Sequence, residues 1–525
     1  MIEDPRTVVG LHDTLLFMAA FPDDAELRTR VDRALRNIAT RANELCRRAR
    51  TARRLENTGI VHTATICALT FEGAAWLAQR FGSMVEIAWE HDADPTPLDE
   101  LLHELVEPIE QDGLLGDARS TQEWFRFAKG RRRRSDLAFL IERLSLLPAS
   151  PHIRERLFDH LDLRLRWRLR EKAASRTFAR FPPRRICYQR EPLRRGAALD
   201  EIIPRPLPAP RLLPVRAARD LIHCLRAALA VRHRETDAVT YANPREVTVA
   251  ALEDGHDVAL VGSRADRRLP IESFFGFVVA RNRVPIGYGG GWVFFDRCEI
   301  GVNIFDAFRG GESAQTFAQI MRVYHHYYRV RRFRVDPYQF GAGNPEAIRS
   351  GAFWFYYRLG FRPVEPRVAE RAAAEWRRLH AEPGGRTSLR LLRRFAESPL
   401  EWTFGDSSCE TPDVAALGAA TTRWIAREFR GDRVRAKRIC RGRLAVALGL
   451  KRLDCWKPEE FRALEQLSLL IAQIPDLADW PQRDRNLLAR AIRAKGGPRE
   501  RTYARALQSL PRLREALLMI ARRRR

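Results

Sequence analysis

The stretch RSGAFWFYYRLGF, residues 349–361, concentrates aromatic side chains in a chain that is otherwise rich in arginine. Its pattern is typical of a short helix, and the run stops abruptly at Gly360 and Phe361. A helix this apolar has to bury most of its surface against other elements. The fold therefore depends on what surrounds this segment.

The residues before this helix read mainly as strands. A helix is predicted over 312–328 and a strand over 331–340, and the turn 281–283 is expected to form a hairpin. Four β-rich runs come earlier, at 257–263, 273–281, 284–295 and 299–305. Antiparallel strands followed by strand, helix, strand and helix indicate an α/β (α+β) fold with a mixed sheet.

The flanking regions have a helical sequence pattern instead of a strand-like one. Both flanking regions are predicted to be all-α. In the N-terminal region, residues 1–200, an apolar stripe at helical spacing is formed by Leu27, Val31, Leu35, Ile38 and Leu45. Five prolines between positions 204 and 214 make 201–214 the best linker. The mixed α/β domain is expected over 215–370, and a second helical region over 385–525.

Arginine dominates the charge of the chain. The sequence holds 92 Lys and Arg against 66 Asp and Glu, a formal net charge of +26. Such a surplus attracts polyanions, including nucleic acid, anionic lipid and phosphorylated ligands. The alternative is a genome that favours arginine codons, with the charge spread over solvated helix faces.

Several classes of protein are not indicated by the sequence. No run approaches the roughly 18 uncharged apolar residues that a membrane helix needs, and residues 15–21 lack the basic leader of a signal peptide. The eight cysteines are scattered without a CxxC pair, which suggests neither a disulfide framework nor a zinc site. We expect a soluble cytoplasmic protein with no membrane partner and no metal.

Over about 256–365, the order of elements and the residues at their joints resemble the GNAT superfamily of N-acyltransferases. A late helix of that family often reads Asn-x-x-Ala-Ile-x-x-Tyr-x-x-x-Gly-Phe. Arg349 stands at the Asn position, and Asn344 is either a displaced relic of that Asn or a turn residue. The positions that keep the family spacing are Ala352, Phe353, Tyr356, Gly360 and Phe361.

The resemblance implies how this helix packs. One face lies on the sheet, and Tyr356 points toward the sulfur of the coenzyme. Gly360 ends the helix in a left-handed turn, which glycine adopts at little cost, and the final strand begins at Phe361. The rings implied to be mainly core are Phe353, Trp354, Phe355 and Tyr357.

A second stretch, EIGVNIFDAFRGGESA at 299–314, resembles the family's coenzyme loop. There a strand runs into Arg/Gln-x-x-Gly-x-Gly/Ala, and backbone N–H groups at the next helix start hold the pyrophosphate of acyl-coenzyme A. If Arg309 occupies the Arg/Gln position of this motif, Ala314 falls at its final Gly/Ala position and Glu312 falls where the family has the middle Gly. A shift by one residue makes Gly311 the middle Gly, with Phe308 and Ser313 at the ends. We prefer the first register, because it keeps the spacing from strand to loop.

Glu312 is the main departure from the family pattern. A like-charge contact near 4 Å costs on the order of 4 kcal/mol at a surface dielectric, so a carboxylate beside pyrophosphate opposes binding. Alternatively, Glu312 caps its own helix. In that case Gly310, Gly311 and Ser313 still present N–H groups to a phosphate.

Acylation of an amine by acetyl-coenzyme A or another acyl-coenzyme A needs a base, donors for the oxyanion and an acid for the leaving thiolate. By resemblance, Tyr356 is the acid, although its ring could instead simply pack in the core. Glu299 is the preferred base, against the alternative of a solvated carboxylate, and Asp336 is a weaker candidate. The strand backbone around Asn303 and Ile304 would align the thioester arm.

This interpretation requires an opening in the sheet. Strands 299–305 and 332–338 are expected to part beside Tyr356, so that the pantetheine arm can enter between them. The amine acceptor is not identified by the sequence, although the basic surface favours one that is acidic or attached to nucleic acid.

Other motifs are given structural interpretations. His325 and His326 lie mid-helix without a metal partner, and 103–107 lacks the second His of a zinc-protease helix. The glycines of 287–292 are expected in a strand rather than a phosphate loop. The basic runs at 129–135 and 522–525 are either nucleic-acid contacts or solvated segments.

Two functions follow from these residues. The first is an N-acyltransferase that moves an acyl group from coenzyme A to an amine. The second is a non-catalytic protein that keeps the same scaffold and binds a polyanion such as nucleic acid through arginine-rich surfaces. Glu312 and Arg349 favour the second, whereas Tyr356 and the Gly-Phe pair favour the first.

Overall fold

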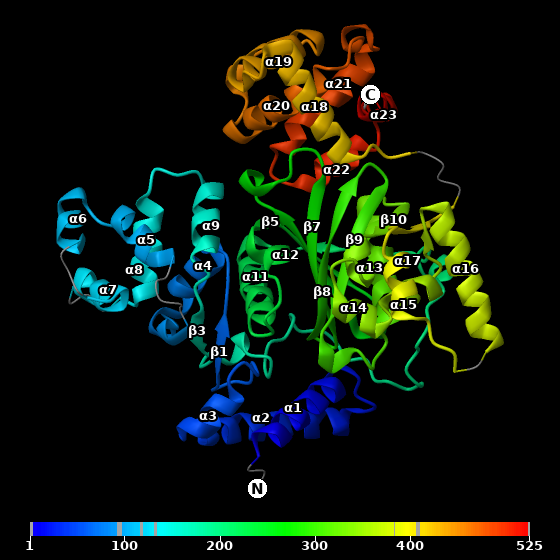
Figure 1. Ribbon diagram of the computed structural model, residues 1–525. Helices are drawn as coiled ribbons and strands as arrows, with labels where there is room; N and C mark the ends of the chain where they lie inside the picture. Colours follow the sequence, from blue (N-terminus) through cyan, green and yellow to red (C-terminus); the bar gives the residue numbers. More distant parts are fainter. Residues whose placement is uncertain are drawn as a thin grey trace. The chain divides into compact units, whose positions relative to one another are not determined.

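The computed structural model describes residues 4–91, 97–115, 119–130, 134–382, 384–405 and 410–522 (Figure 1). The chain packs as two compact units. Unit 1 contains Met1–Arg190, Arg219–Tyr241 and Arg281–Pro285, and unit 2 contains Glu191–Ala218, Ala242–Ala280 and Ile286–Arg525. The predicted α/β class is confirmed at the level of a large mixed sheet with helices.

Unit 1 is largely helical, and local sequence explains where its first helices begin. The Asp4 side chain accepts a hydrogen bond from the Thr7 N–H and Asp24 accepts one from the Leu27 N–H, which are the expected N-caps. The predicted stripe of α2 is buried at Val31, Leu35, Ile38 and Leu45. The helices are α1 (Pro5–Ala20), α2 (Ala25–Leu45), α3 (Ala49–Leu55), α4 (Phe71–Phe81), α5 (Pro97–Leu101), α6 (Pro108–Leu115), α7 (Thr121–Lys129), α8 (Asp136–Leu146), α9 (Pro151–His160) and α12 (Asp237–Thr240).

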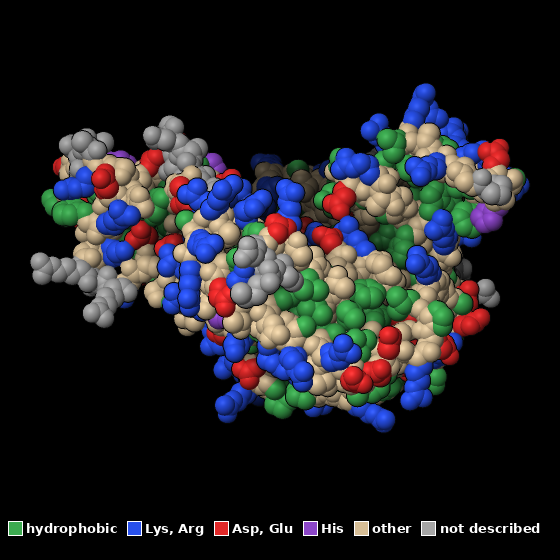
Figure 2. Space-filling model, turned by 90° about the horizontal axis from the view of Figure 1, so that it is seen from below, with side chains coloured by type: hydrophobic (Ala, Val, Ile, Leu, Met, Phe, Trp, Pro, Cys, Tyr) green, Lys and Arg blue, Asp and Glu red, His purple; other side chains and the backbone are tan. Residues whose placement is uncertain are grey.

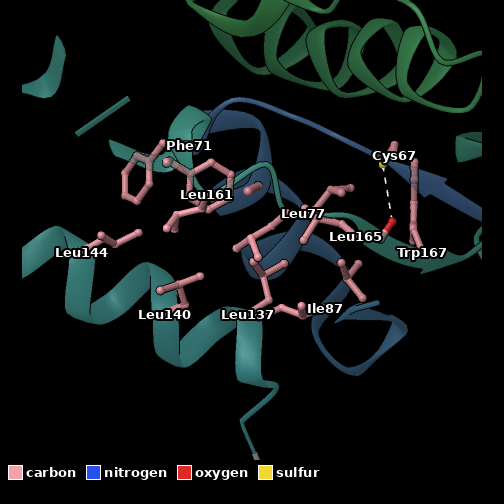
Figure 3. Close-up of a cluster of buried hydrophobic side chains, with 14 of the residues drawn as sticks. Cys67, Phe71, Leu77, Ile87, Leu137, Leu140, Leu144, Leu161, Leu165 and Trp167 are labelled. Carbon is pink, nitrogen blue, oxygen red and sulfur yellow. Dashed lines mark hydrogen bonds between the residues drawn. The ribbon is translucent and has the colours of Figure 1, made fainter. Parts of the chain in front are cut away.

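Unit 1 also contains a sheet, so the prediction of an all-helical N-terminal region was wrong. The antiparallel strands β1 (Ala64–Cys67), β2 (Val85–Ile87) and β3 (Leu165–Arg168) are ordered β1-β3-β2. They are three or four residues long, too short to show a clear alternating pattern. Their inward side chains meet α4 and α8 in one apolar cluster, which includes Leu77, Leu140 and Trp167 (Figure 3).

Helix α11 (Val215–Ala230) has most of its length in unit 1, although the sequence placed it with the mixed sheet. Ala227, Ala230 and Val231 join the apolar cluster of unit 1. An amphipathic pattern shows that a helix has a buried face, but it does not show which neighbour covers that face.

Unit 2 is built on a sheet of nine strands in the order β11-β12-β10-β9-β8-β7-β6-β5-β4. Strand β9 pairs with β10 in parallel, whereas β8 with β9 and β10 with β12 are antiparallel. The predicted hairpin at 281–283 joins β7 and β8. The strands are β4 (Arg211–Leu212), β5 (Ala242–Ala251), β6 (His256–Ser263), β7 (Ser273–Arg281), β8 (Val284–Phe294), β9 (Arg297–Ile304), β10 (Arg332–Val335), β11 (Arg362–Pro363) and β12 (Leu400–Thr403).

The sheet extends beyond the predicted domain at both ends. The proline-rich segment 201–214 contributes β4, which pairs with β5, and β12 lies after the expected limit at 370. The helices alongside the sheet in Figure 1 are α13 (Ser313–Tyr328), α14 (Pro345–Ser350), α15 (Ala352–Arg358), α16 (Pro366–Ala381) and α17 (Leu389–Phe395). The short helix α10 (Leu199–Ile202) packs on α13.

The C-terminal helices belong to unit 2 as well. Their apolar cluster includes Phe294 and Phe295 from the end of β8. The Glu246 carboxylate of β5 accepts the backbone N–H groups of Glu500 and Arg501 at 2.8 and 2.7 Å, which fixes the start of α22 to the sheet. These helices are α18 (Val414–Phe429), α19 (Arg433–Ala447), α20 (Pro458–Ile471), α21 (Gln482–Lys495), α22 (Glu500–Leu507) and α23 (Pro511–Arg522).

Within the ranges that the structure describes, no helix combines the length and the apolar character needed to cross a bilayer. Of the two basic runs noted in the sequence, 131–133 and 523–525 lie outside the described residues.

Candidate functional site

The two parallel strands of unit 2 part early. Strand β9 pairs with β10 from Arg297 opposite Arg332 to Glu299 opposite Arg334, and β10 ends one residue later at Val335. Strand β9 continues to Ile304, and its remaining residues pair with β8. Pairing between β9 and β10 therefore stops after Glu299, where β10 itself ends and the chain turns into the short helix Pro337–Phe340.

The parting leaves one edge of β9 without a strand partner from Ile300 to Ile304 among the described residues. The side chain of Gln339, from the short helix Pro337–Phe340, lies beside Gly301, where a Cβ atom would be 3.1 Å from its Nε2. Farther along, the Asn303 Oδ1 atom is buried and has no hydrogen-bond partner. A buried acceptor of this kind is costly to leave unpaired, which is typical of a ligand position.

The loop after β9 uses some of its own donors. The Gly311 N–H donates to the Phe308 carbonyl at 3.0 Å, so that group closes a turn. The exposed guanidinium of Arg309 pairs with Asp306 at 3.0 Å and with Glu346 at 3.3 Å. Gly310 is exposed, and Ser313 and Ala314 form the first turn of α13.

Glu312 is buried at the N-cap position of α13, but its side chain makes no capping hydrogen bond, so the capping alternative was wrong. Its Oε1 instead accepts the backbone N–H of Arg194 at 3.1 Å. Gln315 Nε2 donates to the Gly196 carbonyl at 2.8 Å, so residues 194–196 lie against the first turn of α13. The carboxylate is thus held by another segment of the chain.

The run 349–361 forms two helices rather than one. Helix α14 ends at Ser350, Gly351 is left-handed with a φ of 68°, and α15 then holds the aromatic residues. Asn344 is the N-cap of α14, where its Oδ1 accepts the Ala347 N–H at 3.1 Å. Gly360 has a positive φ of 98°, as expected for the end of the helix.

Tyr356 lies inside an aromatic cluster. Its ring meets those of Phe317, Phe340 and Phe361 edge-on, with centroids 5.7, 6.3 and 5.9 Å away. Burial raises the pKa of its phenol well above the ordinary value. The hydroxyl therefore keeps its proton at any physiological pH, so it is available as a proton donor.

Glu299 is half-buried at the last paired position of β9. Burial is the main cause that raises the pKa of Glu299, and the negative charge of Asp336 raises it further. The positive charges of Arg334 and Arg297 lower this pKa, but by less. A raised carboxyl pKa suits a general base that works near neutral pH. The cross-strand partner of Glu299 on β8 is Trp292, whose ring is 38% exposed.

The remaining candidates have structural partners. The exposed Asp336 accepts the Tyr338 N–H at 2.8 Å and so caps the short helix after β10. His325 Nδ1 is 2.6 Å from the Val330 carbonyl, and His326 Nε2 is 3.0 Å from the Ile203 carbonyl. Both rings are thereby engaged with the backbone.

The structure thus brings Asn303, Ile304 and the loop 309–314 together at one end of β9, with Glu299 at the other end of the parted edge. The sequence did not single out Arg194 or Gln339, since neither lies in a recognisable motif. Three pockets among the described residues have volumes of about 1190, 430 and 410 Å³, and no predicted site residue lines them.

Comparison of the chain with protein-family models, with curated proteins and with solved structures gives no match.

Proposed function

We propose that unit 2 is a GNAT-like N-acyltransferase domain, which moves an acyl group from acyl-coenzyme A to an amine. One observation supports the proposal: pairing of parallel strands β9 and β10 ends immediately after Glu299 and leaves an edge of β9 without a strand partner, and this edge leads to the start of α13. The buried and unpartnered Asn303 Oδ1 lies on this strand and supplies an acceptor for an amide N–H of the pantetheine arm.

The chemistry assigns one task to each group. Glu299 takes a proton from the ammonium, and the free amine attacks the thioester carbonyl to form a tetrahedral intermediate. Backbone N–H groups of the free β9 edge stabilise its oxyanion. The C–S bond then breaks and Tyr356 donates its proton to the departing coenzyme A thiolate. The second proton, lost from the nitrogen as the amide forms, returns to the Tyr356 phenolate.

Glu312 does not oppose this proposal as strongly as the sequence suggested. Its carboxylate is turned to the Arg194 N–H instead of the open side of the loop. The guanidiniums nearby are already paired with acids, Arg194 with Glu191 and Asp254, and Arg309 with Asp306 and Glu346. A pyrophosphate would therefore be held mainly by backbone N–H groups of the loop.

Calorimetric titration of acetyl-coenzyme A into the full chain tests the proposal. We expect binding with a dissociation constant of about 0.1 mM or tighter. Gly301→Val should abolish it, because the added side chain fills the parted edge beside Gln339. The matched control is Gly10→Ala, at a position with open space around it. No heat from the wild-type chain, or unchanged binding in Gly301→Val, would contradict the proposal.

A second candidate is the non-catalytic scaffold that binds a polyanion. It is favoured by residues 194–196, which lie against the first turn of α13 where the pyrophosphate would bind. It predicts no heat with acetyl-coenzyme A, together with nucleic-acid binding that weakens steeply with salt. A flat salt response would remove this candidate.

A further inference from the structure

One pocket lies within unit 1 and shares no residue with the proposed acyltransferase site. It has a volume of about 1190 Å³. Its walls come from the end of α2, from α3, from the start of β1 and from β3. Five of its lining residues are arginines: Arg47, Arg53, Arg166, Arg168 and Arg170.

The arginines on β3 are compensated by acids. Arg166 pairs with Glu56 at 3.4 Å and with Glu90, and Arg168 pairs with Glu86 at 2.8 Å. These pairs hold the two guanidiniums in place along one wall of the pocket. Part of the positive charge of this wall is therefore already used within unit 1.

The arginines at α3 are not compensated in this way. The segment RRARTARR, residues 47–54, carries five arginines and no acid. All five are exposed, and for Arg47, Arg50 and Arg53 the described residues provide no ion pair. In Figure 2, which views unit 1 from the side of α1–α3, Lys and Arg side chains gather on this face. The charge on α3 thus remains available to a ligand.

His62 lies in the wall of the pocket near cationic side chains. It lines the wall at the start of β1 in a left-handed conformation, with a φ of 71°. Burial lowers the pKa of its imidazole, and the nearby cations Lys172 and Arg170 lower it further.

We infer that this arginine-lined pocket, with the exposed face of α3 at its rim, binds the phosphodiester backbone of nucleic acid. The inference rests on unit 1 alone and is independent of acyl transfer, while it gives the polyanion-binding candidate a defined surface. No Phe, Tyr or Trp lines the pocket, so bases have no ring on which to stack. Recognition is therefore of phosphates and is independent of sequence.

The pocket suits an extended ligand better than a single phosphate. Among the described residues, the lining arginines without an ion pair are Arg47, just before α3, Arg53 on α3 and Arg170, just after β3. A row of cations along a helix matches successive phosphates of a chain, each of which releases counterions when it is neutralised.

The test measures polarisation of a fluorescein-labelled 20-base-pair duplex titrated with the full chain over a range of salt concentrations. The variant Arg47→Gln/Arg50→Gln/Arg53→Gln should weaken binding about tenfold or more, and it should reduce the salt slope by about two to three. Glutamine preserves helix propensity, so α3 should persist. Circular dichroism and thermal melting confirm that the variant folds.

The matched control is Arg367→Gln/Arg371→Gln/Arg377→Gln on the exposed face of α16, which removes the same charge. This control variant should weaken duplex binding by less than about threefold and leave the salt slope of binding unchanged. Equal losses in both variants would overturn the inference, because a general field would then explain binding. A salt-independent affinity would also overturn it.

Further arms distinguish other anions. Inorganic phosphate at constant ionic strength should displace the duplex only weakly, and displacement at low concentration would show a small-phosphate site instead. Stronger binding to phosphatidylserine vesicles than to the duplex would overturn the inference in favour of a membrane surface. Acetyl-coenzyme A calorimetry on the α3 variant should match wild type, so failure of either proposal is visible separately.

Discussion

At the scale of single residues, the same side-chain type has different roles according to what its neighbours supply. Glu312 is buried and held by the Arg194 N–H, whereas Glu299 is half-buried beside Asp336 with a raised pKa. Both are carboxylates within one stretch of sequence. Their roles follow from contacts with residues distant in the chain, so a motif alone does not assign them.

The buried carboxyl of Glu246 leads to a prediction about pH. Burial raises its pKa to about 7 from the ordinary value of 4.5, with the charge of Glu500 acting in the same direction. Between these pH values the folded state holds a proton that the unfolded state has released. The free energy of unfolding should therefore fall by on the order of 3 kcal/mol as pH rises from about 4.5 to 7, and then level off.

Urea unfolding of wild type and Glu246→Gln between pH 4.5 and 8 checks this prediction. The variant loses one acceptor for the N–H groups at the start of α22 and should be less stable at low pH by about 1–3 kcal/mol. The difference between the two proteins should shrink as pH rises. A difference that stays constant with pH would show that Glu246 is ionised throughout.

At the scale of elements, the aromatic run shows how one glycine changes a helix. The sequence predicted one helix ending at Gly360, but Gly351 breaks it into α14 and α15. Asn344 caps the start of α14, and Arg349 is exposed near the end of the same helix. The aromatic residues of α15 then pack separately from α14: the ring of Tyr356 contacts Phe317 of α13 and Phe340 of the short helix after β10.

The break at Gly351 can be tested against a glycine in a regular helix. Gly351→Ala should destabilise unit 2 by about 1 kcal/mol, because an L-residue is strained at a φ of 68°. Gly418→Ala should instead stabilise it by about 0.5–1 kcal/mol, since Gly418 is exposed within α18 with open space around it. Denaturant midpoints of both variants provide the measurement, and a stabilising Gly351→Ala would show that α14 and α15 form one helix.

At the scale of the whole molecule, the C-terminal helices and the sheet form one unit. From the sequence we predicted 385–525 to be a separate region, because its helical pattern differs from the strand-like pattern before it. In the structure, β12 lies inside the sheet, and Phe294 of β8 lies in the apolar cluster of α18–α23. A change in the sequence pattern shows where strands give way to helices. It does not show where one folding unit ends and another begins.

Phe294→Ala tests this arrangement. Removal of a fully buried ring should cost about 3–5 kcal/mol. Hydrogen exchange measured by mass spectrometry should then show faster exchange in both β8 and the C-terminal helices, because they share the cluster. If exchange rises in the helices alone, the C-terminal region is an independent domain. Phe127→Ala, on an exposed ring of unit 1, is the control and should leave unit 2 unchanged.

The sequence alone determined the alternation of strands and helices, the stripe of α2, the hairpin at 281–283 and the end of the aromatic helix at Gly360. Each of these depends on residues close together in the chain, where periodicity and backbone preference act directly. Only the tertiary structure decided where α11 packs, what holds Glu312, and which arginines are left without acids. Those outcomes depend on contacts between distant segments, and local pattern does not encode which distant segment arrives.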